Sequence, residues 1–266
     1  MSSKQIFNAQ NLNDLFYFLK SINDSTIVSG CTQIKELPEK AIAVRSIPEL
    51  NFAIKRETRF DFGPEITLSQ ILRLDPSKVP QVFYEAVKSV GNSNIRNMAT
   101  LAGNICAKNY RHTLFAPLLA LDSKIELKSE KETAHISITG IDTIPENFVI
   151  TRIMIPVEEW DVSIFRRLGP SHAITENSAS FVFLANSVKN QIANIRIAFA
   201  GPFSLRSQEL ENKLLGAHLP LSTTMIQETV EEAAVIFDEK SEKKGTSAVL
   251  KAQFLNLVKS SLEQLT

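Results

Sequence analysis

The first half of the chain changes between helical and strand-like spacing of its apolar residues. Residues 11–21 carry apolar side chains at helical spacing, and Asn11 or Asn13 is placed to cap that helix. Residues 25–28 and 41–44 are short apolar runs typical of strands. Because helix and strand alternate here, we expect a small parallel sheet in this part of the chain.

A second pattern begins near residue 51. Strand-like alternation is seen at residues 51–54, 59–62, 124–128 and 148–155. Helical spacing is seen at residues 67–72 and 80–90, and residues 114–121 form an apolar run typical of a buried segment. This region therefore predicts a mixture of strands and short helices rather than a continuation of the first pattern.

A charged break at residues 158–161 separates the last part of the chain. Beyond it, residues 180–187 and 192–200 read as an antiparallel strand pair, and residues 208–215, 224–237 and 247–265 read as amphipathic helices. Strands followed by helices indicate an α+β domain. We therefore predict a first domain over residues 1–158, with lobes of about 1–50 and 51–158, and a C-terminal α+β domain over residues 159–266.

Composition excludes several classes of protein. The 266 residues include 44% hydrophobic residues, and 29 basic and 29 acidic residues balance to a net charge of zero, so nothing points to nucleic acid or an anionic membrane. No signal peptide and no run of about 18 apolar residues is visible, which predicts a cytoplasmic protein that does not span a membrane. The only cysteines, Cys31 and Cys106, are too few for an iron–sulfur cluster.

The sequence shows no catalytic set that would work without a cofactor. The four histidines have no metal-ligand spacing, and the nucleophile-elbow and P-loop patterns are absent. The Gly-x-Gly-x-x-Gly fingerprint is also absent, which argues against a Rossmann dinucleotide site. We therefore predict no catalytic residues and no metal site of its own, and expect a bound cofactor to supply the chemistry.

Two stretches rich in small residues are candidates for holding that cofactor. Residues 95–104, IRNMATLAGN, read as the end of a helix followed by a tight polar turn in which Gly103 can adopt a positive φ. Residues 29–34, SGCTQI, form another small-residue turn after the strand at 26–28. In chain order, residues 29–34 are the first stretch, or first turn, and residues 95–104 are the second stretch. Exposed N–H groups in such turns suit an anion, so both turns are predicted to converge on one pyrophosphate.

At these two turns the chain resembles a known family, the FAD-binding (medium) subunits of the molybdenum hydroxylases, the xanthine dehydrogenase and carbon monoxide dehydrogenase group. That family carries a "GGT" turn and, later, a stretch close to "IRNxATxGGN", which correspond here to Gly30-Cys31-Thr32 and residues 95–104. The resemblance runs over nearly the whole chain and weakens after about Glu158. It implies a two-lobed FAD-binding domain of the vanillyl-alcohol-oxidase type, followed by a smaller α+β domain.

The resemblance also implies which residues hold FAD. The implied cofactor-binding residues are Ser29, Gly30, Cys31, Thr32, Gln33, Ile34, Thr100, Ala102, Gly103, Asn104, Thr113, Ile150 and Arg166. Within this set, backbone N–H groups of both turns and the hydroxyls of Thr32 and Thr100 would bind phosphate oxygens. Ile150 would lie against the flavin ring, and Arg166 would favour the reduced, anionic flavin.

Three of these positions depart from the family pattern. Cys31 replaces the second glycine of the first turn, Ala102 replaces the first glycine of "GGN", and Thr113 occupies the position of an aspartate. The run that ends in Thr113, residues 108–113, is larger and more basic than in the family. These departures leave open whether the site still binds FAD.

The resemblance implies an FAD-dependent oxidoreductase subunit of the xanthine dehydrogenase type. It would take electrons from [2Fe–2S] clusters on a small partner subunit and pass them through FAD to NAD⁺ or another acceptor, while a large molybdopterin-binding subunit oxidises the substrate. One alternative is a non-catalytic assembly subunit that has kept the fold and lost the flavin. Another is a free-standing flavin oxidoreductase with a small diffusible substrate.

Overall fold

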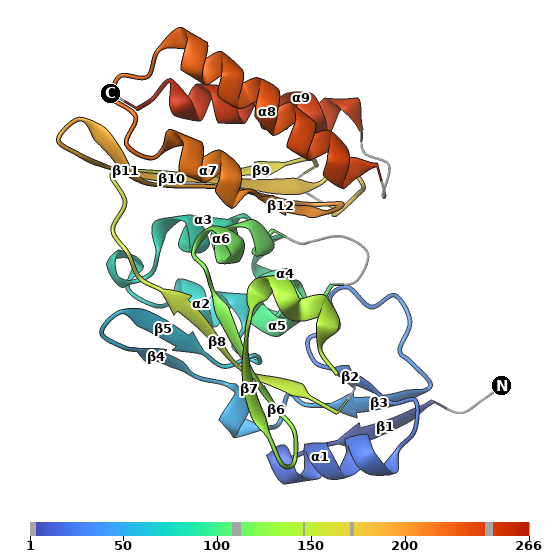
Figure 1. Cartoon of the computed structure of the whole chain (residues 1–266). Coiled ribbons are helices and arrows are strands. Elements are labelled where there is room, and N and C mark those ends of the chain that lie inside the picture. The colour runs from blue at the N-terminus through green and yellow to red at the C-terminus, as the bar shows by residue number, and fades with distance from the viewer. Residues whose placement is uncertain (1–3, 108–112, 146, 171–172, 243–246, 266) are drawn as a thin grey trace. The chain divides into compact units, whose positions relative to one another are not determined.

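The computed structural model describes residues 4–107, 113–145, 147–170, 173–242 and 247–265 (Figure 1). The chain forms two compact units that are each built from separate stretches of sequence. The first unit comprises Met1–Val79, Asn92–Ala107 and Asp122–Val157. The second comprises Pro80–Gly91, Lys108–Leu121 and Glu158–Thr266.

The first unit begins with a three-stranded parallel sheet, which confirms the predicted one. Its strands are β1 (Gln5–Asn8), β2 (Thr26–Val28) and β3 (Lys40–Ala43), in the order β1-β3-β2. Helix α1 (Leu12–Ser21) begins after Asn11, whose side chain accepts a hydrogen bond from the Asp14 N–H at 2.9 Å. This bond satisfies one of the free N–H groups at the helix start. Strand β1 was not predicted, because its four residues are mostly exposed.

The rest of the first unit is a five-stranded antiparallel sheet with short helices. The strands are β4 (Ala53–Lys55), β5 (Arg59–Phe62), β6 (Lys124–Lys128), β7 (Thr133–Ser137) and β8 (Val149–Pro156), in the order β4-β5-β8-β6-β7. The helices are α2 (Leu68–Leu72), α4 (Ser93–Met98) and α5 (Leu101–Ile105), and the 3-10 turns are Pro48–Leu50, Pro76–Lys78 and Ile138–Thr143.

A buried carboxylate joins two strands of this sheet. Asp61 of β5 is fully buried, and it accepts hydrogen bonds from Arg59 at 2.8 Å, Arg152 of β8 at 3.0 Å and Arg56 at 3.2 Å. Burial alone would raise the pKa of Asp61, but the bonds from Arg59 and Arg56, the charge of Arg59 and the bond from Arg152 outweigh it and lower the pKa. The carboxylate is therefore ionised and paired, as a buried charge must be.

The second unit is a four-stranded antiparallel sheet with helices on both faces (Figure 1). The strands are β9 (Val162–Leu168), β10 (Ala179–Val188), β11 (Gln191–Ala200) and β12 (Ser204–Arg206), in the order β12-β11-β10-β9. Helices α7 (Gln208–Leu214), α8 (Thr223–Ser241) and α9 (Ala248–Leu262) cover one face, and α3 (Gln81–Ser89) and α6 (Phe115–Ala120) cover the other.

The predicted antiparallel pair in this unit is confirmed. Strands β10 and β11 pair along their length, and the turn between them places Lys189 and Asn190 at φ 52° and 59°. Two consecutive positive φ angles are typical of a tight hairpin turn. Phe254 of α9 packs edge to face on Phe181 and on Phe199 in the core. The three predicted C-terminal helices are also present.

The predicted division into domains of 1–158 and 159–266 stays a prediction. In the structure the chain passes from the first unit to the second at Val157–Glu158, next to the predicted boundary. Helices α3 and α6, however, precede that boundary in sequence and belong to the second unit, where they pack on strands β9, β10 and β11.

Candidate functional site

The central stretch is folded differently from the sequence-based prediction. Helix α4 ends at Met98, and α5 begins directly after Thr100, so that Gly103 lies inside a helix. Thr100 caps α5 by accepting a hydrogen bond from the Gly103 N–H at 3.1 Å. Leu101 and Ile105, four residues apart, are both buried and hold the helix to the core. The predicted bare turn with a positive φ at Gly103 is therefore wrong.

The N–H groups of the second stretch are already engaged within the chain. The Leu101 N–H donates to the Ile66 carbonyl at 3.0 Å, and the Ala102 N–H donates to the Pro64 carbonyl at 3.1 Å. The Asn104 N–H donates to the Thr100 carbonyl at 3.1 Å. Because Ala102 lies in a helix, the alanine costs nothing through its φ angle. The backbone donors available to an anion are therefore to be sought in the first stretch.

The first stretch presents such donors. Within the described parts of the chain, the N–H groups of Gly30, Cys31, Thr32 and Gln33 donate no hydrogen bond, whereas the Ile34 N–H donates to the Cys31 carbonyl at 3.3 Å. Cys31 has a φ of 53°, in the left-handed region. Successive N–H groups around a left-handed residue form a concavity that suits an anion. The N–H groups of this turn are therefore available, and their assignment to an anion stays a prediction.

The strain at Cys31 leads to a prediction about stability. Cys31→Gly is expected to raise the free energy of unfolding by about 0.5–1 kcal/mol, because glycine removes the left-handed penalty but loses more chain entropy on folding. Urea unfolding of the parent, Cys31→Gly and Cys31→Ala measures this. Cys31→Ala keeps the strain and removes the contact from Sγ to the Ser29 carbonyl at 3.2 Å. A glycine variant less stable than the alanine variant would contradict the prediction.

The two stretches meet at Gly30. A Cβ atom added there would lie 1.8 Å from the Met98 carbonyl oxygen and 2.7 Å from its carbon. Gly30 therefore allows the first turn to rest on the backbone between α4 and α5. Arg45 lies beside this contact, with its guanidinium 3.4 Å from the Asn97 carbonyl and 3.6 Å from the Met98 sulfur. The fold thus brings together two stretches that lie about seventy residues apart in the sequence.

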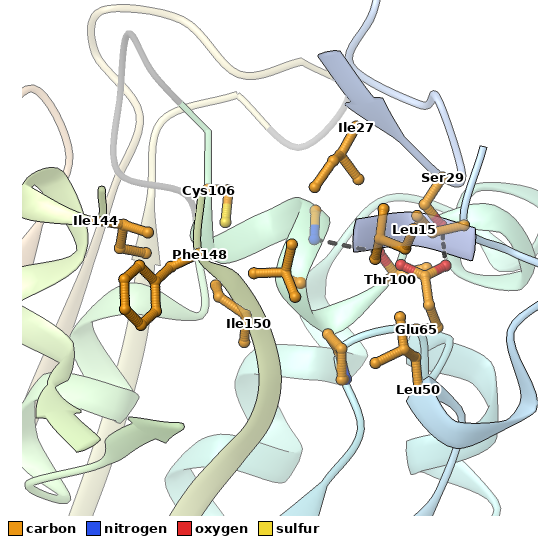
Figure 2. A pocket seen from close by; sticks show the side chains of 15 residues that line it. Leu15, Ile27, Ser29, Leu50, Glu65, Thr100, Cys106, Ile144, Phe148 and Ile150 are labelled. Carbon is orange, nitrogen blue, oxygen red and sulfur yellow. Dashed lines mark hydrogen bonds between the residues drawn. The ribbon is translucent and has the colours of Figure 1, made fainter. Parts of the chain in front are cut away.

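Beside this contact lies a cavity of about 250 Å³ within the first unit (Figure 2). Its polar end is formed by Ser29, Glu65 and Thr100, together with the backbone of Ala102 and Gly103. Its apolar end includes Ile144, Phe148, Val149 and Ile150, and Cys106 also lines it. A concave site that is mostly apolar, with a few polar groups at one end, is typical of cofactor-binding pockets.

Strand β8 supplies two consecutive residues to the apolar end. Side chains of a regular strand alternate between its faces, yet Val149 and Ile150 both line the cavity. The pairing of β8 with β6 shifts register at this point, since Glu126 pairs with Arg152 and Leu127 pairs with Ile150. Such an irregularity re-aims side chains next to functional sites. Ile150, which the sequence analysis placed against the cofactor, does line the cavity.

Glu65 is a site residue that the sequence did not predict. It follows strand β5, is only 6% exposed and accepts a hydrogen bond from the Ser29 hydroxyl. Burial raises the pKa of its carboxyl group above the ordinary 4.5, and the bond from Ser29 and the charge of Arg45 offset this only in part. Nothing in the local sequence, a glutamate between Pro64 and Ile66, indicates that its side chain is buried.

The raised pKa of Glu65 predicts a pH dependence of stability. Below about pH 4.5 the carboxyl group is protonated in both the folded and the unfolded chain, so its contribution is fully present. As the pH rises through the folded-state pKa, the unfolded chain ionises more readily and that stability is lost. Urea unfolding across this range should therefore show parent stability falling relative to Glu65→Gln, which cannot ionise. Parallel curves would contradict the assignment.

The remaining predicted site residues lie elsewhere. Ile34 and Cys31 are exposed and, like Thr32 and Gln33, do not line the cavity, while Asn104 is buried in α5. Thr113 and Arg166 belong to the second unit and are not among the lining residues. Arg166 lies in β9 and donates to the Phe165 carbonyl at 2.8 Å. Most of the basic run at 108–113 lies outside the described residues.

Two further observations concern metals and membranes. Among the residues that the structure describes, no group of three or more histidine, cysteine, aspartate or glutamate side chains could hold a metal ion. In the same described ranges, no helix has both the length and the apolar character needed to cross a membrane.

Comparison with known proteins identifies relatives over most of the chain. Residues 2–158 match the family described as "FAD binding domain in molybdopterin dehydrogenase". The glyceraldehyde dehydrogenase medium chain of Sulfolobus acidocaldarius is 24% identical over 262 residues, covering 90% of both chains. The nicotinate dehydrogenase FAD-subunit of Eubacterium barkeri is 22% identical over 233 residues, covering 79% of this chain and 77% of the relative.

Solved structures share the fold. A chain of reconstituted CO dehydrogenase from Oligotropha carboxidovorans superposes with a TM-score of 0.81 at 15% identity, covering 99% of this chain and 96% of the other. A chain of quinoline 2-oxidoreductase from Pseudomonas putida 86 superposes with a TM-score of 0.79 at 14% identity, covering 99% and 95%. The predicted α+β fold class is confirmed by these similarities.

Proposed function

The chain belongs to the family of FAD-binding domains in molybdopterin dehydrogenases, and on that premise we propose that it is the FAD-carrying electron-transfer subunit of a multi-subunit molybdenum hydroxylase. It would take electrons from [2Fe–2S] clusters on a small partner subunit and deliver them to NAD⁺ or another acceptor. Substrate oxidation would occur on a separate, molybdopterin-binding large subunit. We also propose that the protein is cytoplasmic.

The residues of the first unit fit FAD. The free N–H groups of residues 30–33 would hold the pyrophosphate, since successive backbone donors favour an anion. The apolar end of the cavity, with Phe148 and Ile150, would exclude water from the flavin ring. Thr100 would add a hydroxyl donor, because its oxygen accepts from Gly103 while its hydrogen stays available. The roles of Thr113 and Arg166 remain proposals from the resemblance alone.

The single observation that carries the proposal is the contact at Gly30. It rests the first turn, which follows the lining residue Ser29, on the backbone between α4 and α5, and this would suit a cofactor with a phosphate end and a flat apolar ring. FAD supplies a group that can accept electrons singly and release them as a pair, which suits a position between iron–sulfur clusters and a hydride acceptor. The chain itself has only two cysteines, so any clusters would lie on partners.

The proposal is supported by the names of the relatives. One is a medium chain and another an FAD-subunit, and each is similar to this chain over more than three quarters of its length. Such names describe parts of larger enzymes. Co-expression with candidate small and large subunits, followed by co-purification through a tag on this chain, tests the assembly. Recovery of this chain alone in every combination would count against it.

The first experiment is the visible absorption spectrum of the purified full chain, before and after incubation with FAD and removal of the excess. We expect flavin bands that stay with the protein. Adding partner subunits and a reductant for their clusters should then bleach these bands. A chain that retains no FAD or FMN under any condition would rule out the electron-transfer proposal.

A second candidate function is an assembly subunit that has lost the flavin. The engaged N–H groups of residues 101–104 favour it, because the second stretch then offers few donors to a pyrophosphate. It differs from the first proposal in one readout: the protein would be colourless yet still co-purify with its partners. The third candidate, a free-standing flavin oxidoreductase, would turn over an electron donor without partners.

A further inference from the structure

Backbone hydrogen bonds fix the chain around Glu65 in the wall of the cavity. Its own N–H donates to the Leu50 carbonyl at 2.9 Å, and the Pro64 carbonyl before it accepts from the Ala102 N–H at 3.1 Å. The next residue, Ile66, accepts from Leu101 at 3.0 Å. The backbone that carries Glu65 is therefore fixed between Leu50 and helix α5, and the bond from the Ser29 hydroxyl holds its side chain in the cavity wall.

Only one oxygen of the Glu65 carboxyl group has a partner in the described part of the chain. Oε2 accepts from the Ser29 hydroxyl, and no described group donates to Oε1. The residue is nonetheless 94% buried and lines the cavity, where Figure 2 shows it next to Ser29 and Thr100. Within the described residues Oε1 is not one of the fully buried side-chain atoms that lack a partner, so it stays open to the cavity and can accept a hydrogen bond from a bound group.

The surroundings of Oε1 restrict which chemical group could bind to it. A phosphate oxygen would repel a carboxylate, and the free N–H groups of residues 30–33 would provide a separate site for an anion. The apolar end of the cavity offers nothing that would draw a polar group toward it. A neutral hydrogen-bond donor therefore fits Oε1 better than an anion does. In nucleotide-binding folds an acidic side chain commonly meets that need by binding a sugar hydroxyl.

We propose that Glu65 is a cofactor-binding residue, whose free oxygen binds a hydroxyl group of FAD while Ser29 holds the other oxygen. This inference rests on the proposed function, since it takes FAD as the ligand. The hydroxyl has two possible sources in FAD, the ribose of adenosine and the ribityl chain of the flavin. Both carry the same chemistry, and the experiment below separates them.

The raised pKa of Glu65 supports this assignment. A carboxyl group that is neutral over part of the pH range repels a nearby pyrophosphate less than an ordinary glutamate would. Arg45 is the charged side chain that influences Glu65, and Cys106 is the other titratable group that lines the cavity. A glutamine, which keeps an acceptor oxygen of the same reach, should therefore preserve most of the contact.

The test measures the affinity of the full chain for FAD by titration of flavin fluorescence. Glu65→Ala is expected to weaken binding about 5- to 10-fold, which is the loss of one hydrogen bond, and Glu65→Gln should stay within about twofold of the parent. Glu49→Ala is the matched control, because Glu49 is an exposed glutamate of the same unit that does not line the cavity. It should bind as the parent does.

Two FAD analogues separate the sources of the hydroxyl. One has a 2′,3′-dideoxyribose on adenosine, and the other has an unsubstituted alkyl chain in place of ribityl. The analogue that lacks the contacted hydroxyl should bind the parent about 5- to 10-fold more weakly than FAD and bind Glu65→Ala with no further loss. The other analogue should show the same effect of Glu65→Ala as FAD does.

The outcomes are distinct from failure of the proposed function. If the parent retains no FAD, the proposed function fails and the inference fails with it. If the parent binds FAD and Glu65→Ala binds equally well, only the inference fails. If Glu65→Ala lost the same affinity for FAD and for both analogues, Glu65 would merely support the first turn. That result also overturns the inference. If Glu65→Ala does not fold, the test uses the parent alone, which should bind one analogue more weakly than FAD. Equal binding of FAD and both analogues by the parent would contradict the proposal.

Discussion

Gly30→Ala is expected to abolish retention of FAD and to lower the free energy of unfolding of the chain by about 3 kcal/mol. The added Cβ would lie 1.8 Å from the Met98 carbonyl oxygen, which is backbone and cannot move aside as a side-chain end can. The first turn would have to lift away from the stretch between α4 and α5. That movement would displace the lining residue Ser29, and with it the free N–H groups of residues 30–33 that follow it.

Gly103→Ala is the matched control for the stability part of this prediction. A Cβ at Gly103 would meet only the Thr100 Oγ1 atom, at 3.0 Å, and alanine is the better helix former, so we expect stability within about 1 kcal/mol of the parent. Urea unfolding gives the stability of both variants, and the flavin absorbance left after gel filtration gives their retained FAD. If Gly30→Ala retained as much FAD as the parent, the contact between the two stretches would not be what forms the site.

Glu211→Ala is expected to destabilise the second unit by about 3–5 kcal/mol, because it removes one partner of a buried ion pair. Glu211 lies in α7, and its oxygens accept from Arg206 at 2.9 and 3.1 Å and from the Ile197 N–H at 3.0 Å. Arg206 also donates to the Leu119 carbonyl at 2.9 Å, so the pair joins helix α6 to the sheet and to α7. Its loss would leave a buried guanidinium without its counter-charge.

Glu209→Ala separates the buried pair from a general effect of removing acid from α7. Glu209 is exposed on the same helix, so its loss should change the free energy of unfolding by less than about 0.5 kcal/mol. Both variants are measured by thermal and urea unfolding, with tryptophan fluorescence as one probe, since Trp160 lies in the second unit. Similar losses for the two variants would show that the ion pair contributes little.

The elements that were predicted correctly depend on neighbours within a few residues. Helix α1 begins after Asn11 because that side chain accepts a hydrogen bond from the Asp14 N–H, only three residues further along the chain. The β10–β11 hairpin follows from two apolar runs around a tight turn at Lys189 and Asn190. Such patterns are visible in the sequence because spacing alone specifies them.

The second stretch shows where local reasoning failed. Small residues at 102 and 103 suggested a bare turn, yet the same residues sit in α5. The helix forms because Thr100 caps it and because buried contacts hold Leu101 and Ile105, and burial is a property of the folded chain. Tertiary packing can override a weak local preference in this way. The short helix also engages the N–H groups that the sequence had assigned to phosphate.

By itself, the sequence determined the fold class, the two small-residue stretches and, through resemblance, the family to which the chain belongs. Only the tertiary structure decided that Gly30 rests on Met98, that Glu65 is buried against Ser29, and that α3 and α6 join the second unit. The reason is the distance along the sequence between the residues that interact. Periodicity and capping act over three or four residues, whereas the Ser29–Glu65 hydrogen bond joins positions 36 residues apart, and no local pattern specifies such a contact.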